Sequence, residues 1–172
     1  MLKRATAPSD PFPFHQRSEV DIDADVGSVF AFLDDHRRLA GHMQKPSLWM
    51  AGATMKVETD ELLGQAVGSL IRMSGRVLGL TLAVEEVVTE RVPPWRKTWE
   101  TRGVPRLLVI GAYRMGFVVS PRDSRSRLGV FIDYQLPAEG LSRGVGLIAG
   151  RTYASWCTRQ MATDAAAALA ES

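Results

Sequence analysis

The order of its candidate elements constrains the fold of this chain more than any other feature. A short head with one strand pattern and one helix pattern (residues 18–33) comes first, strand-like sequence fills about 54–136, and one amphipathic segment (140–170) closes the chain. As a helix, that closing segment would span roughly 45 Å, enough to cross a small domain. A helix of this length after an antiparallel sheet is usually what the sheet wraps around. Such an arrangement leaves a cavity between sheet and helix, and cavities of this kind hold ligands.

Alternating apolar and polar residues predict the strands of the middle segment. The clearest run is residues 78–88, where leucine and valine recur at every second position and Glu86 is the polar exception. Residues 107–120 and 128–136 alternate in the same way and flank the polar turn 121–127. Long strands joined by short polar turns are typical of a curved antiparallel sheet.

Helices are expected on both sides of these strands. Residues 18–22 alternate as a first strand, and Asp25 can cap a helix over 26–33, with a second short helix over 36–42. The closing helix is expected over 141–169. Glycine recurs in its first turns, at positions 144, 146 and 150, where it weakens a helix, so we expect close packing or a hinge there.

Composition places the chain among ordinary globular proteins. At 172 residues it fits one domain, and 45% hydrophobic and 23% charged residues allow a sizeable core. A net charge of +2 is too balanced to indicate nucleic-acid binding. No apolar run approaches the roughly 20 residues of a membrane span, so stable membrane insertion is not expected.

The first residues and the cysteine usage bear on location. Residues 1–14 contain three prolines and no apolar stretch behind the early basic residues, so we expect a flexible tail rather than a secretory signal, followed by one domain over 15–172. The single cysteine, Cys157, excludes an intrachain disulfide and is expected to be a buried apolar side chain. Together these features predict a cytoplasmic protein.

At the level of short motifs the chain resembles a known superfamily. The residues that carry the likeness are 18–35 (SEVDIDAD at the start, VFAFLDD at the end), 68–69 (GS), 84–88 (VEEVV), 93–95 (PPW) and the long helix after Pro137. This pattern, over about 16–170, resembles the START-like (SRPBCC) superfamily, which includes polyketide cyclase/dehydrase and lipid-transport proteins. The resemblance implies an α+β helix-grip fold. In that fold a curved antiparallel sheet of about six or seven strands wraps around a long C-terminal helix, with two short helices after the first strand.

The resemblance also bounds the expected function. Members of the superfamily bind lipids, sterols, polyketides, plant hormones or quinones, and a minority are enzymes. They share no universal catalytic motif, so no catalytic residue can be carried over. The metal-binding pair of the Rieske-oxygenase branch has no counterpart among the scattered His15, His36 and His42. We therefore expect neither a metal nor a cofactor.

Candidate ligand-binding residues come first from the strands. Trp95, Lys97 and Trp99 share a parity, so they either line a pocket that takes an acidic or aromatic group, or form core with the lysine amine in water. A second group would make an aromatic wall or ordinary core, with a tyrosine hydroxyl available to a ligand carbonyl. Its members are Tyr113, Met115, Phe117, Ile132 and Tyr134.

Two further groups lie on the closing helix and in a loop. An apolar stripe through Val145, Ile148, Tyr153 and Cys157 also contains Thr152, Trp156 and Gln160 as candidate ligand contacts. The loop residues Leu48, Trp49 and Met50 are large and apolar, which predicts either a lid over the cavity mouth or a homodimer contact. Glu85 and Glu86 are adjacent in a strand and point to opposite faces, so they cannot act as a pair.

Three functions remain open, and the first is favoured over an enzyme. A carrier or sensor for a hydrophobic molecule such as a lipid, quinone or polyketide predicts a large, mostly apolar cavity. A cyclase/dehydrase-type enzyme predicts a perturbed ionisable group in that cavity, with a tyrosine or arginine that polarises a carbonyl. A protein-interaction module predicts a filled core and an exposed patch around Trp49.

Overall fold

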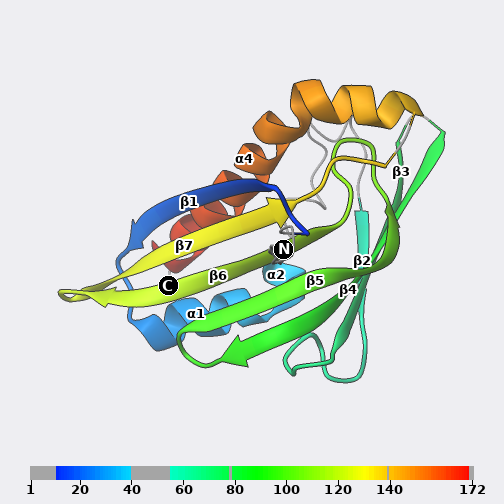
Figure 1. Ribbon diagram of the computed structural model, residues 1–172. Helices are drawn as coiled ribbons and strands as arrows, with labels where there is room; N and C mark the ends of the chain where they lie inside the picture. Colours follow the sequence, from blue (N-terminus) through cyan, green and yellow to red (C-terminus); the bar gives the residue numbers. More distant parts are fainter. Residues whose placement is uncertain (1–10, 40–54, 78, 139, 171–172) are drawn as a thin grey trace, which may run out of the picture.

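A computed structural model describes residues 11–39, 55–77, 79–138 and 140–170 (Figure 1). In chain order, its elements are β1 (Phe14–Ile22), α1 (Val26–Asp34), α2 (His36–Leu39), β2 (Met55–Thr59), β3 (Leu70–Val77), β4 (Leu80–Val92), β5 (Arg96–Arg106), β6 (Tyr113–Arg122), β7 (Arg125–Tyr134) and α4 (Gly140–Ala170). The loop residues Leu48, Trp49 and Met50 fall outside the described residues.

The described strands form one antiparallel sheet of seven, in the order β1-β7-β6-β5-β4-β3-β2. Figure 1 shows the sheet curving, with α4 running behind β1 and β7 and the short helices α1 and α2 near β6. From β2 to β7, neighbouring strands of the sheet follow one another in sequence. β1 is the exception: it pairs with β7, and α1 and α2 connect it to β2 at the opposite edge of the sheet. The predicted α+β helix-grip architecture is therefore confirmed, including the two short helices after the first strand.

The first strand begins earlier than the alternation predicted. β1 pairs with β7 from Phe14, which lies opposite Tyr134, to Ile22, and the Phe14 and Tyr134 rings stack at 5.4 Å. Phe12 is also buried, with the Arg114 guanidinium over its ring. Phe12 and Phe14 therefore contact the folded part of the chain, although both precede the alternating run that predicted the strand.

The helix that follows β1 begins as the sequence predicted. The Asp25 carboxylate caps α1 by accepting hydrogen bonds from the Ser28 backbone N–H at 3.0 Å and from the Ser28 hydroxyl at 2.6 Å. Val29, Phe30 and Leu33 are buried on one face of α1. The Phe30 ring meets the Phe117 ring of β6 edge-on, at 5.6 Å. This contact holds the short helices against the inner face of the sheet.

The closing helix packs with a different face than its apolar pattern indicated. Its buried residues are small or flexible, namely Ala154, Cys157, Thr158, Met161, Ala162 and Ala165. Ile148, expected in the buried stripe, is 86% exposed, and Val145 is also exposed. The reason is close approach. A Cβ on Gly146 would lie 2.8 Å from the Val109 carbonyl oxygen, so the first turns of the helix approach the protein through Gly146, while Val145 and Ile148 face outward.

Candidate functional site

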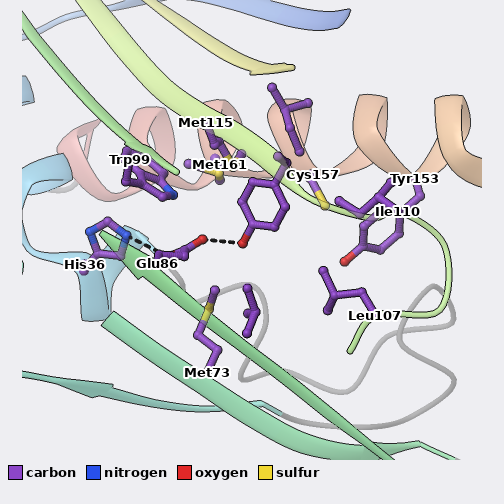
Figure 2. A pocket seen from close by; sticks show the side chains of 13 residues that line it. His36, Met73, Glu86, Trp99, Leu107, Ile110, Met115, Tyr153, Cys157 and Met161 are labelled. Atoms are coloured by element: carbon purple, nitrogen blue, oxygen red, sulfur yellow. Dashed lines mark hydrogen bonds and ion pairs between the residues drawn. The ribbon is translucent and has the colours of Figure 1, made fainter. Parts of the chain in front are cut away.

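A cavity lies between the inner face of the sheet and α4 (Figure 2). Its volume is about 50 Å³. The lining comes from α2, four strands of the sheet's middle, β7, the loop between β5 and β6, and α4. These residues are His36, Met73, Val84, Glu86, Trp99, Leu107, Ile110, Tyr113, Met115, Ile132, Tyr153, Cys157 and Met161. Most of this surface is apolar, and three of its polar groups gather at one end.

Three polar side chains meet at that end, and Figure 2 shows two of them, His36 and Glu86, facing each other. The Tyr113 hydroxyl donates a hydrogen bond to Glu86 Oε1. The His36 ring lies on the other side of the carboxylate, with Nε2 3.5 Å from Glu86 Oε2. The His36 ring also packs edge-on against Trp99, at 4.7 Å between ring centres. We call His36, Glu86 and Tyr113 the polar trio.

The trio is buried and only partly paired. Glu86 and His36 are each 2% exposed, and Tyr113 is buried as well. Among the described residues, neither Glu86 Oε2 nor His36 Nδ1 has a hydrogen-bond partner. A buried polar atom without a partner has lost its hydration and gained nothing in return, which costs about 1–3 kcal/mol. Such atoms beside a cavity are candidate contacts for a bound molecule.

Burial also fixes the protonation of the hydroxyl and thiol groups around the cavity. Burial and the nearby charge and hydrogen bond of Glu86 raise the pKa of Tyr113 well above 10, so its phenol keeps its proton. Burial likewise raises the pKa of Tyr153 well above 10. The pKa of Cys157 rises to about 12 for the same reason, so its thiol is an inert lining group.

Strand alternation explains why Glu86 faces inward. Val84, Glu86 and Val88 share the inner face of β4, whereas Glu85 points outward and pairs with Arg72 of β3, with its Oε2 2.7 Å from the arginine Nε. The prediction that the two glutamates lie on opposite faces is confirmed. The polar trio itself was not predicted. Its one sequence signal was Glu86 as the polar exception on an apolar face, which indicates a buried carboxylate in need of partners.

Four of the predicted ligand-binding residues line the cavity: Trp99, Tyr113, Met115 and Ile132. The others lie elsewhere. Phe117 and Tyr134 are buried core outside the lining, Trp156 is half-buried outside it, and Trp95 is 46% exposed at the start of the β5 region.

The two polar helix residues proposed to orient a ligand do not reach the cavity either. Thr152 is exposed. The half-buried Gln160 donates a hydrogen bond to Asp164 on the same helix, at 2.9 Å. Thr152 and Gln160 therefore lie beside the cavity-facing positions of the helix, whereas Tyr153 and Cys157 of the same predicted stripe do line the cavity.

Lys97 fits neither of its predicted roles. Its side chain is 0% exposed, and Nζ lies 3.0 Å from the Asp34 carboxylate while donating to the Asp34 backbone carbonyl at 2.8 Å. Arg91 binds the other carboxylate oxygen of Asp34 at 2.7 Å. Burial lowers the pKa of Lys97, and the Asp34 charge opposes that shift only in part. The lysine therefore ties the end of α1 to the sheet, away from the cavity.

A larger, open cleft of about 320 Å³ shares no lining residue with the inner cavity. It runs between the start of β1 and the first turns of α4, past Phe14, Leu147 and Arg151. Phe14 and Leu147 are exposed there. The inner cavity is the stronger candidate because it alone of the two is lined by buried polar groups with unused hydrogen-bonding capacity.

Comparisons with known proteins bear on the fold. No family model matches the sequence, and no curated protein matches it significantly. Solved structures do match. A protein from Chromobacterium violaceum is 20% identical with a TM-score of 0.61, over 91% of this chain and 97% of that one.

Two of the similar structures have named activities. An aromatase/cyclase from Streptomyces sp. R1128 is 16% identical with a TM-score of 0.61, over 88% of this chain and 93% of that one. Norcoclaurine synthase from Thalictrum flavum is 12% identical with a TM-score of 0.63, over 100% and 99%. The chain therefore has the same helix-grip fold as these solved structures, which is the fold that the resemblance implied. Within the described part of the chain, no helix is long and apolar enough to cross a membrane.

Proposed function

We propose that this protein binds a small hydrophobic molecule in the cavity between the sheet and α4. The observation that carries the proposal is an apolar cavity closed at one end by a buried, partly unpaired polar trio. Apolar burial would supply most of the affinity, at about 25 cal/mol per Å². The trio would supply orientation, because a few polar groups in an apolar pocket fix the pose of a ligand.

The cavity is smaller than the large cavity that the carrier hypothesis predicts. Its volume of about 50 Å³ holds no molecule of lipid or polyketide size as it stands. Three of its lining residues, Met73, Met115 and Met161, are methionines, whose flexible side chains re-pack around irregular shapes. We therefore expect the cavity to widen on binding through these side chains.

The first experiment is native mass spectrometry of freshly purified protein, followed by solvent extraction. A discrete adduct that solvent extraction removes would support the proposal and identify the ligand class. A bare mass, together with no binding of naphthalene or other small aromatic probes to the methionine-lined cavity, would count against it.

A second candidate function is proton-transfer catalysis of the cyclase/dehydrase kind. One observation favours it, namely a buried carboxylate flanked by a tyrosine hydroxyl and an imidazole inside an apolar cavity. Similarity to an aromatase/cyclase agrees with this candidate at the level of the fold. The tyrosine would act differently than the sequence suggested, because its hydroxyl hydrogen is donated to Glu86 and is not free to polarise a carbonyl.

Hydrogen–deuterium exchange at carbon tests this second candidate without a known substrate. Glu86 as a general base would speed exchange of the acidic C1 protons of 2-tetralone in D₂O, measured by NMR. Glu86→Gln should then lose about 10²-fold or more of that acceleration, and the outward-facing Glu85→Gln should lose none. Equal exchange with and without protein would rule out 2-tetralone-type proton abstraction at this site.

A further inference from the structure

The polar trio has an unequal supply of hydrogen-bond donors and acceptors. Tyr113 has one hydroxyl hydrogen, and it is donated to Glu86 Oε1. The second carboxylate oxygen, Oε2, has no hydrogen-bond partner among the described residues, and the nearest donor atom, His36 Nε2, stands 3.5 Å away. At that distance the two atoms do not form a good hydrogen bond. One lone acceptor on a buried carboxylate is therefore left beside the cavity.

The surroundings do not supply the missing donor. The side chains that line the same cavity near Glu86 are apolar, such as Met73, Val84 and Met115. Arg72 and Arg102 lie opposite Glu85 on the two neighbouring strands, and both pair with Glu85 on the outer face of the sheet. The Tyr153 hydroxyl on α4 lies at the other end of the cavity from Glu86 (Figure 2).

We propose that the cavity selects apolar molecules that carry a hydrogen-bond donor, a hydroxyl or N–H group, which binds Glu86 Oε2. This inference rests on the proposed binding function and adds the chemistry of the ligand's polar group. An ether or hydrocarbon of the same shape fills the apolar space but leaves Oε2 unpaired. A site built around a buried acceptor rejects the analogue that lacks the donor, because the unpaired acceptor remains desolvated.

A set of three probes of matched shape tests the preference. p-Cresol has a hydroxyl donor, 4-methylanisole has an acceptor oxygen without a donor, and toluene has neither. Binding is followed by NMR of the protein labelled at its methionine methyl groups, because Met73, Met115 and Met161 line the cavity. We expect p-cresol to shift these three signals and to bind about ten- to a hundredfold more tightly than 4-methylanisole or toluene, as a hydrogen bond to a charged group predicts.

Two glutamate-to-glutamine substitutions at adjacent positions distinguish an effect of the cavity carboxylate from an effect of a carboxylate on the outer surface. Glu86→Gln removes the carboxylate and should bring p-cresol and 4-methylanisole to within about threefold of each other. Glu85→Gln makes the same chemical change on the outer face, so the full preference for p-cresol should remain.

The outcomes separate the inference from the function beneath it. Equal binding of all three probes at the methionine signals would overturn the donor preference and leave apolar binding standing. Tighter binding of 4-methylanisole than of p-cresol would overturn it too, since the trio would then be a donor site. No shift of the three methionine signals with any probe would overturn both proposals. These comparisons use the unaltered protein, so they decide the matter even where Glu86→Gln does not fold.

Discussion

At the residue scale, the buried charges fall into two groups with different roles. Asp34 is satisfied on every side: Arg91 and Lys97 both contact its carboxylate, and Lys97 also binds its backbone carbonyl. Glu86 is satisfied on one oxygen only. A fully paired buried charge belongs to the structure, whereas an incompletely paired one beside a cavity is available for binding.

The Asp34 cluster predicts a large stability effect from a change of one atom. Asp34→Asn leaves the buried Lys97 ammonium without its counter-charge, which should cost about 3 kcal/mol or more of unfolding free energy. Glu58→Gln breaks the exposed pair with Lys56 and should leave the unfolding free energy nearly unchanged, because exposed ion pairs contribute little to stability. Urea denaturation measures both. Equal effects of the two substitutions would contradict a structural role for the cluster.

The Asp34 carboxylate determines in which direction stability changes with pH. Burial alone would raise the pKa of Asp34, but the hydrogen bonds and charges of Arg91 and Lys97 outweigh it and lower the pKa below 3.8. Because the folded state binds this proton less readily than the unfolded chain, the stabilisation is complete above about pH 4 and is lost as the pH falls further. The difference in unfolding free energy between the protein and Asp34→Asn should therefore stay constant from neutral pH down to mildly acidic pH. It should shrink in more acidic buffer.

At the element scale, the sequence predicted each strand and helix better than how they pack. Alternation placed Glu86 on the inner face of β4 and Tyr113 on the inner face of β6, but these strands are separated by β5. Strands two apart lie roughly 10 Å from each other, so local pattern does not reveal that their side chains meet. Register and the curvature of the sheet decide it: Glu86 lies opposite Thr101 of β5, whose hydroxyl accepts from the Tyr113 backbone N–H at 3.2 Å.

The packing of α4 was missed for a related reason. Periodicity weighted by large apolar residues predicted a stripe that includes Ile148, which is exposed, whereas the first turns of the helix approach the protein through Gly146. Only the later part of that stripe, with Tyr153 and Cys157, lines the cavity. The glycine spacing did carry the signal, and its close-packing alternative is the one observed at Gly146. How closely two elements pack depends on the side chains of both, so it cannot be predicted from the sequence of either segment alone.

Alanine substitutions at two glycines of α4 should change the stability of the protein in opposite directions. A Cβ at Gly146 would meet the Val109 carbonyl oxygen and Pro137 Cδ, each at 2.8 Å, so Gly146→Ala should destabilise the protein by about 1–3 kcal/mol. A Cβ at Gly144 has nothing within 4 Å, so Gly144→Ala should stabilise by up to about 1 kcal/mol through helix propensity alone. Chemical denaturation of the two variants checks the signs, and stabilisation by both would contradict the tight contact.

At the scale of the whole molecule, stability and binding compete for the same space. The sheet curves around α4, and the side chains between them leave about 50 Å³ unfilled. A fully packed interior would be more stable, and a larger cavity would bind larger molecules. The architecture, the antiparallel order and the presence of a cavity were predicted from the sequence. The size of that cavity depends on side-chain packing between segments distant in the chain, so it could not be.

A change of cavity size tests this competition. Met161→Ala removes a buried side chain that lines the cavity, so it should cost about 2–5 kcal/mol of unfolding free energy and create room for naphthalene. Met55→Ala removes an equally buried methionine from β2, outside the lining, and should destabilise the protein without improving naphthalene binding. Saturating naphthalene should then raise the stability of Met161→Ala by more than that of Met55→Ala, because a ligand that binds the folded state more tightly stabilises it more. Thermal unfolding with and without naphthalene measures this gain. If both variants gained equal stability, the space that Met161→Ala creates would add nothing to naphthalene binding.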